Sequence, residues 1–101
     1  MIEEMRGLCP AFADMTIEWA IAGIMDRPGL DLRTRELVLV AACATLGNAA
    51  PQLRAHAEAA LNAGATPLEL RETLLQLTFY AGGPAVRNSL VALRDLLADG
   101  S

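Results

Sequence analysis

Residues 54–75 read RAHAEAALNAGATPLELRETLL, and this stretch contains the end of one helix and the start of the next. Thr66 precedes Pro67, and Glu69 follows at the third helical position, which is the pattern of a capping box with proline at the first position. Gly64 lies just before this start and ends the preceding alanine-rich run, as glycine often does at a helix C-terminus. The stretch therefore predicts two consecutive helices joined by a tight turn.

Glycine and proline divide the rest of the chain in the same way. Residues 37–44 read LVLVAACA, and because this helix is apolar on all sides we expect it to be the most buried element, ending at Gly47. Strand patterns are nearly absent, so the sequence predicts an all-α fold, a compact bundle of about five helices. The predicted helices cover residues 10–25, 32–46, 50 or 51 to 63, 67–81 and 84–98.

The length and the hydrophobic content together predict an oligomeric single-domain protein. A chain of 101 residues is expected to form one domain over residues 1–101. Hydrophobic residues make up 53% of the chain, which is more apolar surface than a small monomer can bury. We therefore expect part of that surface to lie between the subunits of a homo-oligomer.

The charge pattern argues against several kinds of partner. The formal net charge is −4 and the basic residues are scattered, so nucleic-acid binding is not expected. The apolar run at residues 37–44 is too short to span a bilayer, and the start MIEE lacks the basic region of a secretory signal. One histidine and two distant cysteines give neither a zinc-site pattern nor a disulfide framework. We expect a cytoplasmic protein with no membrane segment and no bound metal.

The single histidine, His56, is the first candidate for a functional residue. It shares one side of its predicted helix with Gln52, Leu53 and Ala60. The small side chain of Ala60 leaves space beside the imidazole. Because a histidine titrates near neutral pH, it can serve as a catalytic acid or base. A histidine that only packs at a helix interface, with one hydrogen bond, fits the same spacing, and both interpretations stay open.

Glu36 is the second candidate, because it lies in the first turn of the helix over residues 32–46 in register with Val40. A carboxylate on the core side of a helix costs free energy unless a cation or a donor meets it. The helix dipole explains an acidic residue in the first turn but not its apolar register. In the same turn, Arg33 is interpreted as a surface charge, and Arg35 is open to a salt bridge or to carboxylate binding.

The remaining thiols and large aromatic rings give weaker indications. Cys43 lies in an apolar stretch and is interpreted as a small buried hydrophobe instead of a reactive thiol. Cys9 precedes Pro10 near the N-terminus. Trp19 and Tyr80 are expected in the core or in an interface, with a pocket wall as a further role.

The order of these motifs resembles the carboxymuconolactone decarboxylase family, which also contains the AhpD-like alkylhydroperoxidases. The segments that carry the resemblance are RPGLDLRTREL at residues 27–37 and RAHAEAALNAGATPLELRETLLQLTFYAGGPA at residues 54–85. The resemblance extends from residue 27 to about residue 97, which is most of the chain. It implies an AhpD-like helical fold that assembles into a ring-like homo-oligomer, a trimer or a hexamer.

The family contains two chemistries, and the cysteine positions distinguish them. AhpD-like peroxidases carry a glutamate, a Cys-x-x-Cys pair and a histidine four residues after the second cysteine. Glu36 and His56 match that pattern, but Ala49 and Gln52 occupy the two cysteine positions. Because a dithiol peroxidase needs both thiols, peroxiredoxin activity is the less favoured alternative.

The resemblance therefore favours the decarboxylase branch, whose substrates are small carboxylated lactones of aromatic catabolism. These anionic substrates carry their own electron sink, so no cofactor is expected. The roles hypothesised from the resemblance are acid/base catalysis by His56, orientation of that ring by Glu36, anion binding by Arg35 or Arg33, and pocket walls from Tyr80 and Trp19. The other alternative is a non-catalytic helical oligomer that binds a small anionic ligand.

Overall fold

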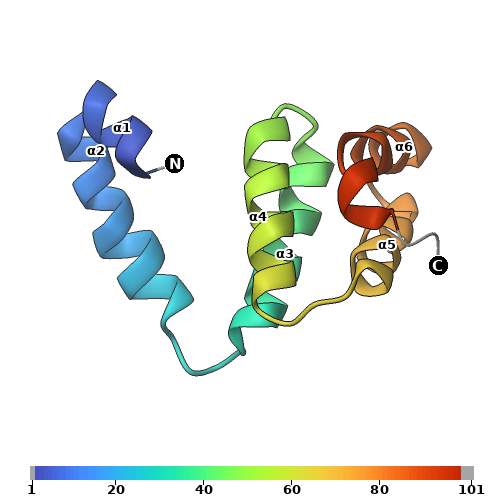
Figure 1. Ribbon diagram of the computed structural model, residues 1–101, viewed down its shortest axis with the longest axis horizontal. Helices are drawn as coiled ribbons and strands as arrows, with labels where there is room; N and C mark the ends of the chain where they lie inside the picture. Colours follow the sequence, from blue (N-terminus) through green and yellow to red (C-terminus); the bar gives the residue numbers. More distant parts are fainter. Residues whose placement is uncertain (1, 99–101) are drawn as a thin grey trace. The chain divides into compact units, whose positions relative to one another are not determined.

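The computed structural model describes residues 2–98, and every regular element within that range is helical, which confirms the all-α prediction (Figure 1). The chain divides into two compact units, Met1–Asp31 and Leu32–Ser101. The second unit contains every residue of the pocket and of the histidine–glutamate contact described below.

The first unit consists of α1 (Ile2–Leu8), α2 (Pro10–Met15) and the π-helix η1 (Thr16–Met25). The helix predicted over residues 10–25 is present, but its hydrogen bonding changes from α to π at Thr16. The sequence analysis missed α1, although acidic residues in its first turn and a basic residue in its last turn complement the helix dipole. The apolar side chains of the first unit are largely exposed. Phe12, Met15 and Trp19 are each more than half exposed.

The second unit begins with the helical hairpin of α3 (Leu32–Leu46) and α4 (Ala50–Asn62), which lie side by side (Figure 1). Both helices have the predicted bounds to within a residue. Gly47 and Gly64 follow them with φ of +78° and +105°, the left-handed backbone that ends a helix at glycine. The unit continues through α5 (Pro67–Leu75), the 3₁₀ turn η2 (Gln76–Phe79), α6 (Gly83–Ala92) and the 3₁₀ turn η3 (Arg94–Leu97).

The last two helices are shorter than predicted, because each tightens into a 3₁₀ turn at its C-terminal end. In η2 the hydroxyl of Thr78 donates to the carbonyl of Leu75 at 2.8 Å, a local bond that competes with regular helix geometry. Leu93 leaves the helical region, with φ −105° and ψ 13°, and its side chain is fully buried there. The predicted helix over residues 84–98 is therefore interrupted at Leu93.

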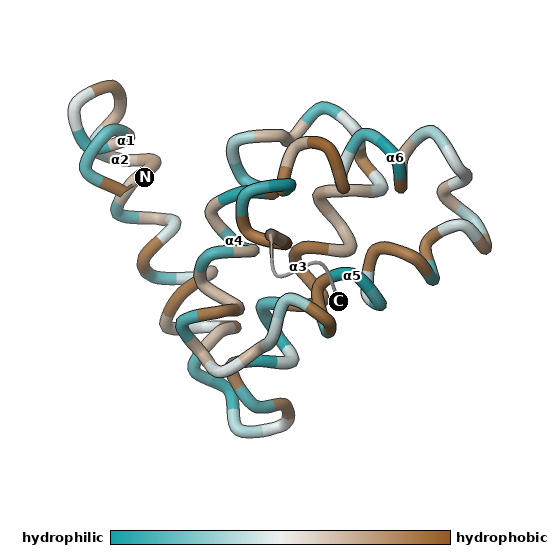
Figure 2. Tube along the Cα trace, turned by 45° about the vertical axis from the view of Figure 1, so that its right-hand side comes forward, coloured by the Kyte–Doolittle hydropathy of each residue, from teal (hydrophilic) through white to brown (hydrophobic). Residues whose placement is uncertain are grey.

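The hydrophobic core of the second unit is formed by small and medium-sized side chains from all of its α-helices except α6, together with two residues outside them. Hydrophobic and hydrophilic segments alternate along these helices in Figure 2. The buried members are Val40, Ala44, Leu53, Ala57, Ala60, Ala65, Leu70, Leu74 and Leu93. The C-terminal segment carries an apolar stripe, in which Val86 and Leu93 are buried and Leu90 and Leu97 are partly buried.

The prediction that the helix over residues 32–46 would be the most buried element is wrong for this chain. Only Glu36, Val40 and Ala44 of α3 are buried, whereas Val38 and Leu46 are more than half exposed. The reason is that α4, α5 and α6 cover α3 on one side, and the opposite apolar side has no covering element in this unit.

An ion pair holds η3 against α4. Nη1 of Arg54 donates to Oδ1 of Asp95 at 2.9 Å, and Arg54 also pairs with Glu58 one turn further along α4. The hydrogen bond from Arg54 lowers the pKa of Asp95 to about 2. The C-terminal turn is therefore fixed to the side of α4 by charge as well as by Leu93.

The capping box predicted from the sequence is confirmed. The backbone N–H of Glu69 donates to Oγ1 of Thr66 at 3.1 Å, and Oε1 of Glu69 accepts from the backbone N–H of Thr66 at 2.9 Å. Two amide groups that the helix itself cannot satisfy thus obtain partners.

Removing this cap should weaken the protein measurably. We expect Thr66→Ala to lower the free energy of unfolding by about 0.5–2 kcal/mol, because the N–H of Glu69 loses its acceptor. Urea denaturation followed by circular dichroism measures the change. Thr66→Ser, which keeps an oxygen at the same place, is the matched control, and equal stability of the two variants would contradict the assignment.

Candidate functional site

The structure brings Glu36 of α3 and His56 of α4 into direct contact. Nδ1 of His56 lies 3.0 Å from Oε2 of Glu36, across the α3–α4 interface. The Glu36 side chain is 7% exposed and that of His56 is 28% exposed, so the carboxylate lies beneath the ring and the ring reaches toward the surface. The packed hairpin thus places the two candidates of the sequence analysis at one point.

The contact determines which nitrogen of His56 is available. An ionised carboxylate only accepts hydrogen bonds, so Nδ1 donates its proton to Glu36. Nε2 forms no hydrogen bond with any residue in the described range 2–98. The arrangement therefore fixes the ring and leaves Nε2 for a bound molecule, which is how a carboxylate orients a catalytic histidine.

The two arginines of the first turn of α3 have different surroundings. Arg33 forms an ion pair with Glu69, the glutamate of the capping box. The backbone hydrogen bond from Thr66 and then the bond from Arg33 lower the pKa of Glu69. Arg35 is half-buried and precedes Glu36 in the chain. Arg33 thus joins α3 to the start of α5, while Arg35 lies in the turn that carries the candidate carboxylate.

The two aromatic residues expected near a pocket are both exposed to solvent in the single chain. Tyr80 is 96% exposed and contacts the ring of Phe79, with 5.7 Å between the ring centroids. Trp19 is more than half exposed and belongs to the first unit. A pocket-wall role for either residue stays a prediction.

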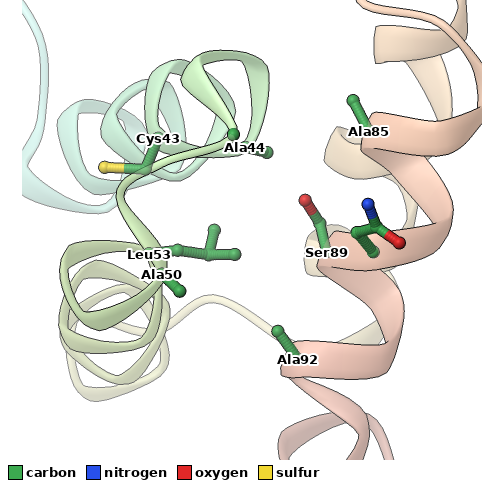
Figure 3. Close-up of a pocket in the computed structure, with 9 residues that line it drawn as sticks. Cys43, Ala44, Ala50, Leu53, Ala85, Ser89 and Ala92 are labelled. Carbon is green, nitrogen blue, oxygen red and sulfur yellow. The ribbon is translucent and has the colours of Figure 1, made fainter.

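A pocket of about 90 Å³ opens between α6 and the corner where α3 leads into α4 (Figure 3). Its lining is mostly small side chains: Cys43, Ala44, Gly47, Ala50, Leu53, Ala85, Asn88, Ser89 and Ala92. Neither Glu36 nor His56 is among them, and these two residues contact each other directly through their hydrogen bond. The sequence analysis missed this pocket, although Ser89 is a polar residue within the apolar stripe between Val86 and Leu93.

The thiols do not form a redox pair. Cys43 is partly buried against the core, and burial raises the pKa of its thiol, which keeps the unreactive protonated form at neutral pH. Cys9 is exposed and lies in the first unit. Ala49 and Gln52 occupy the positions of the redox cysteines. Over residues 2–98 there is also no cluster of three or more His, Cys, Asp or Glu side chains that could hold a metal ion.

Among the helices that the structure describes, none is both long enough and apolar enough to cross a membrane.

Comparison with known proteins identifies the family of this chain. Residues 10–95 match the model of the carboxymuconolactone decarboxylase family. The chain is 37% identical over 97 residues to an uncharacterised 15.0 kDa protein of Paracoccus denitrificans, covering 94% of this chain and 72% of the relative. It is 32% identical over 98 residues to the 4-carboxymuconolactone decarboxylase of Acinetobacter baylyi, covering 97% of this chain and 72% of the relative.

A third relative has a different substrate in its name. The chain is 32% identical over 91 residues to the nitrosuccinic acid decarboxylase of Metarhizium robertsii, and the match covers 85% of this chain and 59% of that protein. The two named enzymes are both decarboxylases, so the similarity supports a decarboxylase-like function. Since the family match covers most of the sequence and both ends of the α3–α4 hairpin, this chain belongs to the carboxymuconolactone decarboxylase family.

Proposed function

We propose that this protein is a cofactor-independent carboxy-lyase that decarboxylates a small carboxylated lactone of aromatic catabolism. The observation that carries the proposal is the 3.0 Å contact between His56 and the buried Glu36, which presents Nε2 of the ring outward. The names of two relatives, the 4-carboxymuconolactone and nitrosuccinic acid decarboxylases, support the reaction class.

The substrate itself explains why no cofactor is needed. When the bond between the ring carbon and the carboxylate breaks, carbon dioxide leaves and the bonding electron pair enters the ring. In an unsaturated lactone that pair reaches the carbonyl oxygen through the ring double bond, giving an enolate. The enolate is then protonated at carbon, so the protein has to supply one proton, one anion-binding group and a stabilising environment.

In this proposal His56 is the acid. Its protonated ring gives the Nε2 proton to the carbon of the enolate, while the Nδ1–H remains hydrogen-bonded to Glu36. Glu36 is a positioning residue, because it touches the ring and not the substrate. Arg35 is the group proposed to bind the substrate carboxylate, since it is half-buried in the turn of α3 that carries Glu36.

We further propose that the protein works as a ring-like homo-oligomer, a trimer or a hexamer. Its support is the apolar surface that a single chain leaves open, which includes Leu75, Phe79 and Tyr80, at 58%, 84% and 96% exposed. A partner chain that covers such groups would also enclose the exposed side of a site built on one hairpin.

The proposal is tested by offering the purified protein 4-carboxymuconolactone and, separately, nitrosuccinate, and measuring carbon dioxide release. Turnover of the lactone is expected. Release from neither compound, with the assembly intact by light scattering, would instead favour a non-catalytic oligomer that binds a small anion. A Cys9→Ser/Cys43→Ala double variant should keep its turnover, whereas loss of activity would favour thiol chemistry.

The positioning role of Glu36 gives a separate prediction. We expect Glu36→Gln to lower kcat for the lactone by about 10- to 100-fold, because a charge-assisted hydrogen bond contributes about 1.5–3 kcal/mol. KM should change less than kcat, since Glu36 acts through the ring and does not contact the substrate. Glu58→Gln on the outer side of α4 is the control. Unchanged kcat in Glu36→Gln would reject the role.

A further inference from the structure

The pocket between α6 and the α3–α4 corner is lined by the hydroxyl group of Ser89. The residue as a whole is 4% exposed, and Figure 3 shows its oxygen directed into the space between the helices. This hydroxyl forms no hydrogen bond with any residue of the described part of the chain. Its oxygen is not a fully buried atom, so the hydroxyl is accessible from the pocket and can pair with a molecule bound there.

The rest of the lining indicates what that molecule is like. Ala44 and Leu53 are buried and form an apolar floor beside Ser89. The exposed rim includes Asn88 and Ala92, of which Asn88 adds an amide whose nitrogen can donate, while its Oδ1 accepts from Nη1 of Arg87 at 3.1 Å. None of the residues that line the pocket has a charged side chain. An ionised ligand would lose hydration against this lining, and the nearby guanidinium of Arg87 already pairs with Asn88, so the lining favours an uncharged molecule.

The size of the pocket sets an upper bound on its ligand. A closed apolar cavity of about 150 Å³ accommodates benzene. A pocket of about 90 Å³ scales to about four non-hydrogen atoms, and its open side lets a molecule of roughly three to five such atoms extend through the mouth.

We propose that this pocket binds one small, uncharged organic molecule with an apolar body and a single hydroxyl or carbonyl group. The apolar body lies against Ala44 and Leu53, and the polar group pairs with Ser89 and Asn88. The site is separate from the proposed catalytic pair. Cys43, on the pocket wall, is two helical turns beyond Glu36 on α3, about 10 Å along the axis.

The test uses 2-methylpropan-1-ol as the probe, which has five non-hydrogen atoms and one hydroxyl. It is titrated into isotopically labelled full-length protein and followed by proton–nitrogen NMR. We expect shift changes that saturate and that concentrate at Gly47, Ala50 and Ser89. The 2-methylpropanoate ion, of nearly the same shape but charged, should give no saturable change.

Two variants connect the binding to the pocket. Ser89→Ala should weaken the binding of the alcohol by about 2- to 10-fold, which is the effect of losing one neutral hydrogen bond. Ala92→Leu, at the exposed rim, should abolish binding by filling the mouth, and Asn88→Leu does the same from another rim position. Val91→Ala, on α6 but outside the lining, is the matched control and should bind normally.

Several outcomes would overturn the proposal. These are absence of saturable binding, equal binding of the carboxylate, and full affinity in both rim-filling variants. If the probe fails to bind and Ala92→Leu also lowers the mass of the assembly in sedimentation, the pocket holds a side chain of a second copy instead. Decarboxylation is assayed independently, so rejecting the pocket-binding proposal does not reject the proposed decarboxylase function, and the reverse also holds.

Discussion

His56→Asn should lower kcat/KM for the carboxylated lactone by about 10²–10⁴-fold while the protein stays folded. The asparagine amide nitrogen lies near the place of Nδ1, so it can still donate to Glu36, but the variant has no group at Nε2 to deliver a proton. The substitution therefore separates catalysis from the packing of the buried carboxylate. Steady-state turnover and thermal unfolding are measured on the same preparation.

The simpler variant, His56→Ala, is less informative because it leaves Glu36 buried without its partner, and loss of stability would accompany loss of activity. Gln52→Ala, one turn earlier on α4 and exposed, is the matched control and should keep its activity. If His56→Asn retains activity within a few-fold of the original protein, His56 is structural and the acid must be sought elsewhere.

Leu70→Ala should destabilise the protein by about 2–5 kcal/mol. Leu70 is fully buried in the core that joins α3, α4 and α5, and truncating it leaves a cavity in a unit built mostly from small side chains. Domains of this size are typically stable by only about 5–15 kcal/mol, so the variant is expected to lose a large share of that margin. Chemical denaturation gives the free energy, and enzymatic activity should fall only as far as the folded fraction does.

Leu75→Ala on the same helix is the control for this effect. Leu75 is 58% exposed, so the same chemical change should cost little in a single chain. If Leu75→Ala proved as damaging as Leu70→Ala at high protein concentration but not on dilution, the exposed leucine would belong to a subunit interface. Equal damage at every concentration would contradict the core described here.

The parts of the fold that sequence could predict are those set by local chemistry. Thr66, Pro67 and Glu69 specify a helix start through bonds within four residues, and Gly47 specifies a helix end through its backbone freedom. The α3–α4 hairpin follows from these helix ends. Local chemistry says only that the Glu36 carboxylate needs a donor, and that His56 supplies it is hypothesised from the family resemblance.

The parts that sequence could not predict depend on tertiary geometry. The apolar run of α3 suggested complete burial, yet hydropathy alone cannot distinguish a covered side from one left open in a single chain. The break at Leu93 lets that side chain reach the core, which no periodicity signals. The pocket at Ser89 arises where small residues of α3, α4 and α6 face one another across separate segments.

The carboxylate of Glu69 makes two interactions: it accepts the capping hydrogen bond at the start of α5, and it pairs with Arg33 at the start of α3. Glutamine would satisfy the cap equally well, but it would remove the negative charge that pairs with Arg33. The capping motif accepts either glutamate or glutamine at position 69, but the ion pair with Arg33, which is 36 residues away in sequence, requires glutamate. A substitution of Glu69 would therefore affect the turn of α3 that carries Arg35 and Glu36 as well as the start of α5.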